Sequence, residues 1–301
     1  MKKLNIMKKL LLLLLFIPLV NCSDSEEILD NVPESNDDTN PVYLDTNGVS
    51  IKAKDWAVIG DSGIINGVTY TIVDRQTLFD MRNEGEDVSA VCTSLITNME
   101  NMLAGYEQWG DVTFLDFNQD ISTWDVSNVT NMTRMFQLSN FNSDISDWDV
   151  SSVTTMFNMF NNNTAFNQEI ADWDVSSVAD FTRMFYSSQF NQDIGNWNVS
   201  SATFMDDMFG LAQFNNDIGD WEVSNVSYMG FMFSGSEFNK DIGGWDVSNV
   251  TNMDYMFAFA LEFNQDLSSW SVENVNDCDF FSLDTPSWTL PQPNFTNCNP
   301  D

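Results

Sequence analysis

The stretch FNQDISTWDVSNVTNMTRMF, residues 117–136, is the first full copy of a repeat that fills most of the chain. It returns six more times. Its tryptophan stands at Trp124, Trp148, Trp173, Trp197, Trp221, Trp245 and Trp270, so the period is 24 or 25 residues. A fixed period of about 20–50 residues is typical of solenoids. The sequence therefore predicts seven stacked coils over residues 117–281, preceded by a degenerate first repeat and an insertion over residues 91–116.

Each repeat keeps its apolar side chains at fixed positions. The Trp-x-Val triplet alternates, which predicts a short strand with both side chains on one face. Residues 129–136 place Val, Met, Met and Phe at i, i+3, i+6 and i+7, which fits a short helical segment. We therefore expect an α/β repeat with one short strand and one short helical segment per coil. A single coil cannot bury so many apolar groups alone, whereas stacked coils can.

An asparagine follows the first phenylalanine of every repeat. The column consists of Asn118, Asn142, Asn167, Asn191, Asn215, Asn239 and Asn264. Asparagine side chains satisfy backbone groups at turns. We therefore expect a stacked asparagine ladder at one corner of the solenoid, with a structural role.

The phrase FNQDISxWDVSNVTNMxxMF closely resembles the repeat of BspA-like leucine-rich-repeat surface proteins, which also occurs in Mycoplasma lipoproteins. The resemblance covers about residues 91–282. It implies a right-handed, leucine-rich-repeat-like solenoid, display on a bacterial surface, and a role in adhesion or interaction. It supplies no catalytic residues.

Residues 1–21 predict a lipoprotein signal peptide, with a lysine-rich start and an apolar run before Cys22. The tail of this segment resembles a bacterial lipobox, which implies that Cys22 becomes a lipidated N-terminus. The acidic run at residues 23–27 resembles the export signal of Bacteroidota lipoproteins that face outward from the outer membrane. The alternative is an ordinary secretion signal with an incidental cysteine.

The segments outside the array predict a tether and two caps. Residues 22–55 are acidic and poor in aromatic side chains, so we expect a disordered tether. Residues 56–90 should form an N-terminal cap, because Asn66-Gly67 favours a hairpin turn and Asp74 can cap a helix over residues 75–82. Residues 282–301 are proline-rich and should fold back as a C-terminal lid.

Two cysteines fall in this C-terminal region. Disulfides form in exported proteins. Because Cys278 and Cys298 lie in the same cap, we expect a disulfide between them. Cys92 belongs to the opposite cap. Seven coils at about 4.8 Å each would place it about 34 Å away, beyond disulfide reach. We therefore expect Cys92 to be an unpaired, covered thiol.

The charge limits the classes of partner and reaction. The chain has 45 acidic and 11 basic residues, and four lysines lie in the leader, so the remainder carries 7 − 45 = −38. Nucleic acid is excluded as a partner, because phosphate binding needs basic clusters. Histidine, the commonest general base, is absent from the sequence. A uniform carboxylate ladder offers no special catalytic pair, so we expect a protein that is not an enzyme.

Two acidic columns are the candidate functional positions. The residue between Trp and Val should point away from the core, and a second acidic column precedes the isoleucine. The first is a candidate cation- or partner-binding face; its acidic members are Asp125, Asp149, Asp174, Glu222 and Asp246. The structural alternative is that these side chains cap turns and keep the surface soluble. Calcium takes several such oxygen ligands, but the sequence defines no metal site and predicts no cofactor.

Three functions are compatible with these features. The first is a monomeric, non-enzymatic surface lipoprotein in adhesion or protein interaction, held to the membrane only by its lipid anchor. The second binds glycans for nutrient uptake, for which exposed Tyr186, Tyr228 and Tyr255 are the candidate side chains. The third is a surface module stabilised by calcium.

Overall fold

The computed structural model describes residues 38–108 and 111–300. All of these except Asp38 belong to one compact unit, Thr39–Asp301. The predicted signal peptide, the predicted lipidation site Cys22 and the first part of the predicted tether lie outside the described residues.

Within the described residues, strands occur before residue 56. Strand β1 (Val42–Leu44) pairs antiparallel with β2 (Ile51–Ala53). The Ile51 amide donates to the Thr123 carbonyl at 2.9 Å, which joins this hairpin to the first regular coil. The prediction of a disordered tether is therefore wrong for residues 42–53. Average composition concealed the few apolar side chains, Val42 and Ile51 among them, that this segment buries.

A second small sheet follows. Strand β3 (Ser62–Ile65) pairs antiparallel with β4 (Val68–Ile72), and the Asn66-Gly67 turn between them has φ values of 51° and 82°. Strand β4 pairs in parallel with β5 (Val91–Cys92). The Asn66-Gly67 turn needs positive φ at both residues, and asparagine and glycine tolerate positive φ best.

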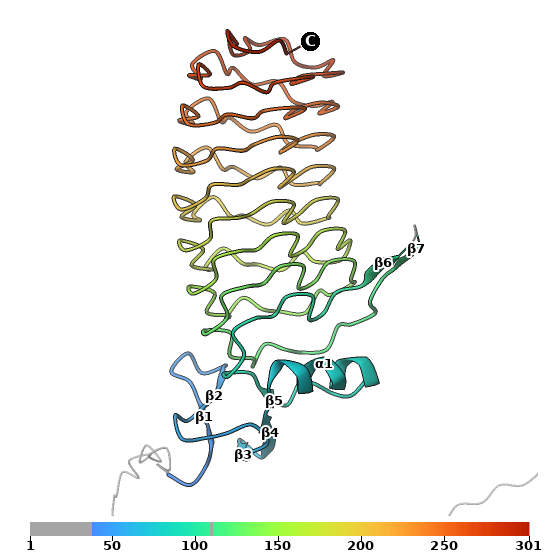
Figure 1. Cartoon of the computed structure of the whole chain (residues 1–301), viewed down its shortest axis with the longest axis vertical. Coiled ribbons are helices and arrows are strands. Elements are labelled where there is room, and N and C mark those ends of the chain that lie inside the picture. Colours follow the sequence, from blue (N-terminus) through green and yellow to red (C-terminus); the bar gives the residue numbers. More distant parts are fainter. Residues whose placement is uncertain (1–37, 109–110, 301) are drawn as a thin grey trace, which may run out of the picture. The chain divides into compact units, whose positions relative to one another are not determined.

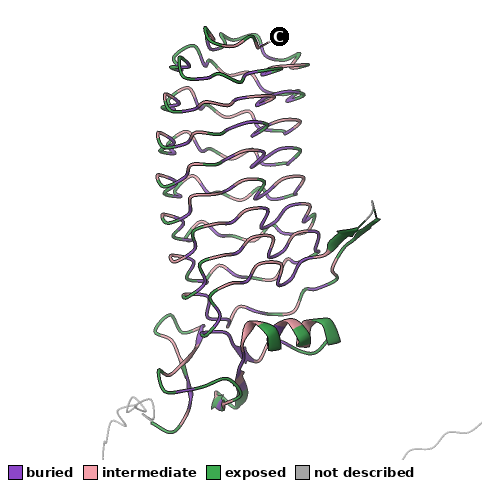
Figure 2. Cartoon of the chain, in the orientation of Figure 1, coloured by how far each residue is buried: buried purple, intermediate pink, exposed green. Residues whose placement is uncertain are grey.

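Helix α1 (Arg75–Glu84) is the one α-helix among the described residues. The Asp74 side chain accepts the Thr77 amide at 2.7 Å and caps its start. Gly85 ends it with a φ of 73°. Leu78 is buried, and the rest of the helix is exposed or partly buried (Figure 2).

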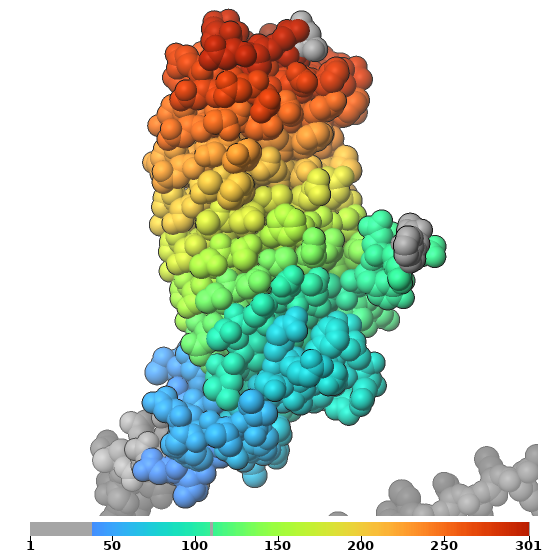
Figure 3. All heavy atoms as spheres, in the orientation of Figure 1, coloured from blue at the N-terminus to red at the C-terminus, as the bar shows by residue number. Residues whose placement is uncertain are grey.

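The remainder of the unit is a stack of coils (Figure 1). Parallel bridges join equivalent residues of successive coils, at Asn98, Asn131, Thr155, Asp180, Phe204, Tyr228, Asn252 and Asp277. The degenerate repeat before residue 117 therefore forms the first rung. A hairpin of β6 (Tyr106–Gln108) and β7 (Asp111–Thr113) is inserted next and projects from the side of the stack (Figures 1 and 3).

The expected strand and helix of each coil are absent: residues 114–300 contain only turns and isolated bridges. The amides of Met132, Arg134 and Phe136 donate to carbonyls of the next coil at 2.8–3.1 Å, so they cannot bond within a helix. The Trp-x-Val stretch is also occupied by tight turns, such as the bond from the Trp148 amide to the Ile145 carbonyl. The prediction of one strand and one helical segment per coil was therefore wrong.

Left-handed residues explain why the helix cannot form. Each coil has two positions with positive φ, four residues apart. They are Arg134 and Leu138, Asn158 and Asn162, Arg183 and Ser187, Asp207 and Leu211, Phe231 and Gly235, Tyr255 and Phe259, and Phe280 and Asp284. This conformation costs a non-glycine residue about 1–2 kcal/mol. The hydrogen bonds between coils offset that cost, because the turns align every second amide with the next coil.

The core is a set of side-chain columns that run through the stack. Trp124 and Trp148 stack with ring centroids 6.4 Å apart, and Phe136 and Phe160 with centroids 5.3 Å apart. Each indole also satisfies its buried N–H. The Trp148 Nε1 donates to the Ile121 carbonyl at 3.2 Å, and the later tryptophans repeat this bond.

The predicted asparagine ladder is present. The Asn118 Oδ1 accepts the Asn142 amide at 2.7 Å, and each asparagine does the same for the next one. At the end of the ladder, the Asn264 Oδ1 accepts the Thr289 and Leu290 amides. The ladder therefore also holds Thr289 and Leu290 of the C-terminal lid.

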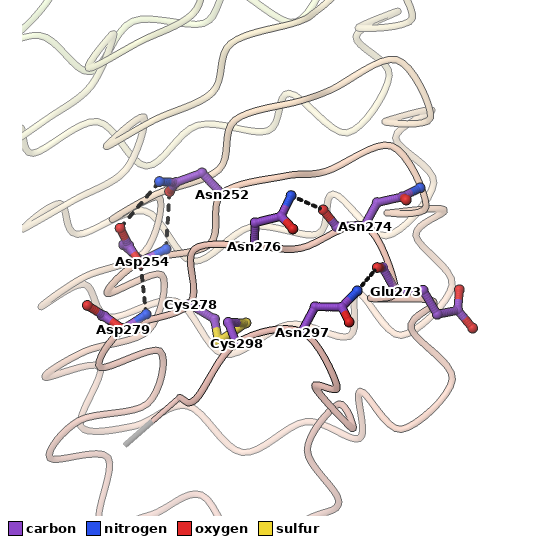
Figure 4. Close-up of a disulfide and its surroundings, with 9 residues drawn as sticks. All are labelled: Asn252, Asp254, Glu273, Asn274, Asn276, Cys278, Asp279, Asn297 and Cys298. Atoms are coloured by element: carbon purple, nitrogen blue, oxygen red, sulfur yellow. Dashed lines mark hydrogen bonds between the residues drawn. A yellow bond between two sulfur atoms is a disulfide. The ribbon is translucent and has the colours of Figure 1, made fainter.

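The C-terminal lid covers the last coil. Trp288 is buried and meets Phe257 and Phe263 edge-on, with ring centroids 5.2 and 4.7 Å apart. Cys278 and Cys298 form a disulfide with Cα atoms 5.9 Å apart (Figure 4). The lid thus replaces the coil that would otherwise cover these aromatic rings.

Candidate interaction surface

The first acidic column serves mainly as turn caps. The carboxylates of Asp149, Asp174 and Asp246 accept the amide of the serine two residues ahead, at 3.0–3.2 Å. Such Asx turns stabilise local backbone geometry. Serine hydrogen bonds also lower the pKa of Asp174 and Asp246. These side chains are exposed, as is Glu222, but the turns already occupy one oxygen of each aspartate.

Asp125 does not belong to an exposed face. Its side chain is buried and accepts the hydroxyls of Ser94 at 2.5 Å and Ser127 at 2.6 Å. The hairpin of β1 and β2 covers this coil, which the repeat pattern could not indicate. The assignment of Asp125 to a partner-binding face is therefore wrong.

The second acidic column behaves in the same way. Six of its aspartates accept the amide two residues ahead: Asp120, Asp144, Asp193, Asp217, Asp241 and Asp266. Across residues 38–108 and 111–300, no group of three or more His, Cys, Asp or Glu side chains could hold a metal ion.

The three cysteines within residues 38–108 and 111–300 offer no exposed nucleophile. Cys92 is unpaired and buried, and its thiol donates to the Ile51 carbonyl at 3.3 Å. Burial raises the pKa of this thiol, which disfavours the reactive thiolate. The disulfide occupies Cys278 and Cys298.

Two stacks of exposed aromatic side chains lie in the fourth to seventh coils. Phe204 stacks on Tyr228 with centroids 5.3 Å apart; Phe231 stacks on Tyr255 at 4.7 Å, and Tyr255 lies 4.9 Å from Phe280. Four of the five rings are 38–42% exposed, and Tyr255 is half-buried. We call these five residues the aromatic face. Of the three tyrosines singled out from sequence, it includes Tyr228 and Tyr255 but not Tyr186.

The phenylalanines of this face escaped the sequence analysis, although a signal was present. In earlier coils the equivalents of Phe204 are Asn131, Thr155 and Asp180, as the bridges between coils show. A polar column that becomes aromatic marks a surface position whose side chain is free of the core pattern. Phenylalanine is so frequent in the core columns that this change is easily overlooked.

Carboxylates adjoin the aromatic face along the chain. Asp254 precedes Tyr255, and its Oδ1 accepts the Asp279 amide at 2.7 Å (Figure 4). Burial, reinforced by the nearby charges of Asp207 and Asp180, raises the pKa of Asp206 to about 6. The surface therefore combines exposed rings with negative charge.

The raised pKa predicts that Asp206→Asn stabilises the protein at pH 7.5 but not at pH 4. The folded-state pKa lies above the ordinary value of 3.8, so this carboxyl contributes stability below about pH 4 and loses it as pH rises through about 6. The full shift corresponds to about 3 kcal/mol, and solvent screening of this partly exposed group reduces the expected gain to about 1–2 kcal/mol. Urea unfolding at both pH values measures it.

Asp246→Asn is the matched control for this prediction. The pKa of Asp246 is lowered by its bonds to Ser248, so its stabilising effect is present above about pH 4 and is lost as the solution becomes more acidic. This variant should gain nothing at pH 7.5. An equal gain in stability for Asp206→Asn at both pH values would contradict the raised pKa of Asp206.

Within the described residues, no helix is long and apolar enough to cross a membrane. The family described as "Mycoplasma protein of unknown function, DUF285" matches the chain over residues 73–186, 106–213 and 190–287. Neither the curated proteins nor the solved structures contain a significant match. Because the matched ranges together run from residue 73 to residue 287, the chain belongs to this Mycoplasma-type repeat family of unknown function.

Proposed function

We propose that this protein is a non-enzymatic bacterial surface lipoprotein that mediates adhesion or protein interaction. The observation that carries the proposal is the aromatic face. The core and asparagine columns repeat from coil to coil, while outward positions such as Phe204 and Tyr228 change from polar to aromatic. Large exposed apolar patches on soluble domains mark sites of interaction.

The arrangement of reactive groups supports a non-enzymatic role. The aspartates of both acidic columns cap turns, and Cys92 is buried. A hydrolase would need a paired acid and base in a cleft. Because the coils repeat, most of the carboxylates have the same surroundings. Nothing in these surroundings makes one carboxylate the acid and another the base.

The proposed location rests on the sequence. The lipobox-like segment before Cys22 and the acidic run after it support an outward-facing outer-membrane lipoprotein of the Bacteroidota type. Two or more acyl chains hold a protein stably to a membrane, since each buried CH2 adds about 0.8 kcal/mol. The chain would then display its stack outside the cell, as a monomer.

The test of the proposed function is Cys22→Ala in the full-length chain, with Ser23→Ala as the matched control. We expect Cys22→Ala to abolish labelling by a radioactive fatty acid and to release the protein from the cell surface. Ser23→Ala should keep both properties. Surface retention is measured by protease accessibility on intact cells. Retention of Cys22→Ala, or protection of the wild type from protease, would overturn the proposed display.

Adhesion itself is tested with intact cells on immobilised matrix proteins and on a glycan array. We expect wild-type cells to bind the immobilised matrix proteins and cells of the Cys22→Ala strain to lose this binding. Binding to glycans alone would replace protein interaction with the carbohydrate function that Tyr228 and Tyr255 could serve.

A further inference from the structure

We propose that the aromatic face binds a cationic segment of a partner protein, whose Arg and Lys side chains lie over the rings and pair with the adjoining carboxylates. This inference rests on the proposed function as an interaction module and names the chemistry of its partner. Cations are attracted to the faces of aromatic rings, and carboxylates add charge-assisted hydrogen bonds.

The protein already contains this arrangement within its own chain. The Arg183 guanidinium bonds the Asp207 carboxylate through Nε at 2.8 Å and lies 5.8 Å from the Tyr186 ring centroid. Two coils before Arg183, the Arg134 guanidinium lies 5.3 Å from the ring centroid of Phe157. Both arginines occupy the same left-handed position of their coils. The surface at this position therefore accommodates a guanidinium beside a ring.

In later coils the same position carries rings. The equivalents of Arg134 are Asn158, Arg183, Asp207, Phe231, Tyr255 and Phe280, each with positive φ. This column therefore carries an arginine in two earlier coils, where the chain supplies its own cation. In the later coils it carries the rings of Phe231, Tyr255 and Phe280. At this position Phe231 and Phe280 are 39% and 38% exposed and Tyr255 is half-buried, whereas Asn158 and Asp207 are buried.

The charge of this region favours a cation from outside. After Arg183, the sequence contains a single basic residue, Lys240. Acidic residues adjoin the rings in sequence, including Asp206, Asp254 and Asp279. Complementary charge accelerates encounter and excludes acidic partners. A neutral sugar could stack on the rings but would leave this charge without a function.

A neighbouring groove has the same character. It is lined by Phe259 and Leu261 together with Glu237 and Glu262. Apolar side chains beside carboxylates suit the long stems and charged ends of Lys and Arg. Phe259 occupies the second left-handed position of the coil whose first is Tyr255.

The test measures binding of a fluorescent (Gly-Arg)6 peptide to the mature protein by anisotropy. The same peptide with citrulline in place of arginine is the neutral probe. We expect the arginine peptide to bind and the citrulline peptide not to bind. The double variant Phe231→Leu/Tyr255→Leu, which keeps apolar bulk but removes two rings, should raise Kd about tenfold. Tyr255→Phe should keep the wild-type Kd.

Two further variants separate this site from general attraction between opposite charges. Asp254→Asn keeps an oxygen for the Asp279 amide and should weaken binding, whereas Asp246→Asn removes the same charge from another column and should not. Thermal melts verify that every variant is folded. Equal weakening by the two Asn variants, no effect of the ring variants, or ring-dependent binding of oligosaccharides but not of the peptide would each overturn the proposal. Because binding is measured in solution, failure here leaves the surface-display test with Cys22→Ala unaffected.

Discussion

Phe209→Ala is expected to lower the free energy of unfolding by about 3–5 kcal/mol. The Phe209 ring is fully buried at the middle of the stack. Its centroid lies 5.9 Å from those of Phe185 and Phe233, in the coils on either side, and 4.2 Å from that of Phe214. Truncation removes the ring's transfer free energy and leaves a cavity that two neighbouring coils cannot fill without breaking their ladder. Urea unfolding followed by tryptophan fluorescence measures the loss.

Phe204→Ala is the matched control in the same coil. Phe204 is 40% exposed and contacts Tyr228 on the surface. Its truncation should cost less than about 1 kcal/mol, because the ring loses little burial. Similar losses for Phe204→Ala and Phe209→Ala would show that the column of buried rings is not the main source of stability. A change in the denaturant dependence would instead indicate that the stack unfolds in parts.

Cys298→Ser is expected to have the second largest effect, a loss of about 3 kcal/mol from the stability of the C-terminal lid. The disulfide closes a loop with a sequence separation of 20, and its removal restores conformational freedom to the unfolded lid. The packing of Trp288 on Phe257 and Phe263 then has to hold the lid without a covalent link. Hydrogen exchange of the last coil measures the change.

The location of this effect distinguishes it from a general loss of stability. In a stacked array each coil contacts mainly its neighbours, so opening should begin at the weakened end. Exchange should accelerate over the lid and the coil of Cys278, and should remain unchanged near Trp148. Wild-type protein treated with dithiothreitol should match the variant. Uniform acceleration along the chain, or no change in the lid, would contradict this account.

Much of the architecture could be predicted from the sequence because its signals are local or repeated. The Asn66-Gly67 dipeptide indicates a hairpin turn that joins β3 and β4, and Asp74 marks the start of α1. The asparagine column predicts a ladder because the same side chain meets the same backbone group in every coil. Periodicity also identifies the buried columns, since only residues that face one another across coils need to be alike.

The internal structure of a coil could not be predicted in this way. Residues 129–136 have helical spacing, yet the structure places Arg134 in the left-handed region and directs alternate amides to the next coil. Spacing reports which side chains share a face, and a chain of tight turns can satisfy the same spacing as a helix. The choice between them depends on hydrogen bonds to residues about 24 positions away, and these bonds exist only in the stack.

The repeat, its period, the buried columns and the turn residues follow from the sequence alone, because each of them depends on neighbouring or repeated positions. Folding of the whole unit is what buries Asp125 against Ser94 and leaves Phe204 and Tyr255 at the surface. Burial depends on what covers a position from elsewhere in the chain. From the periodic pattern alone, every coil is expected to have the same surroundings. In the folded chain the caps and the non-repeating side chains give individual coils different surroundings.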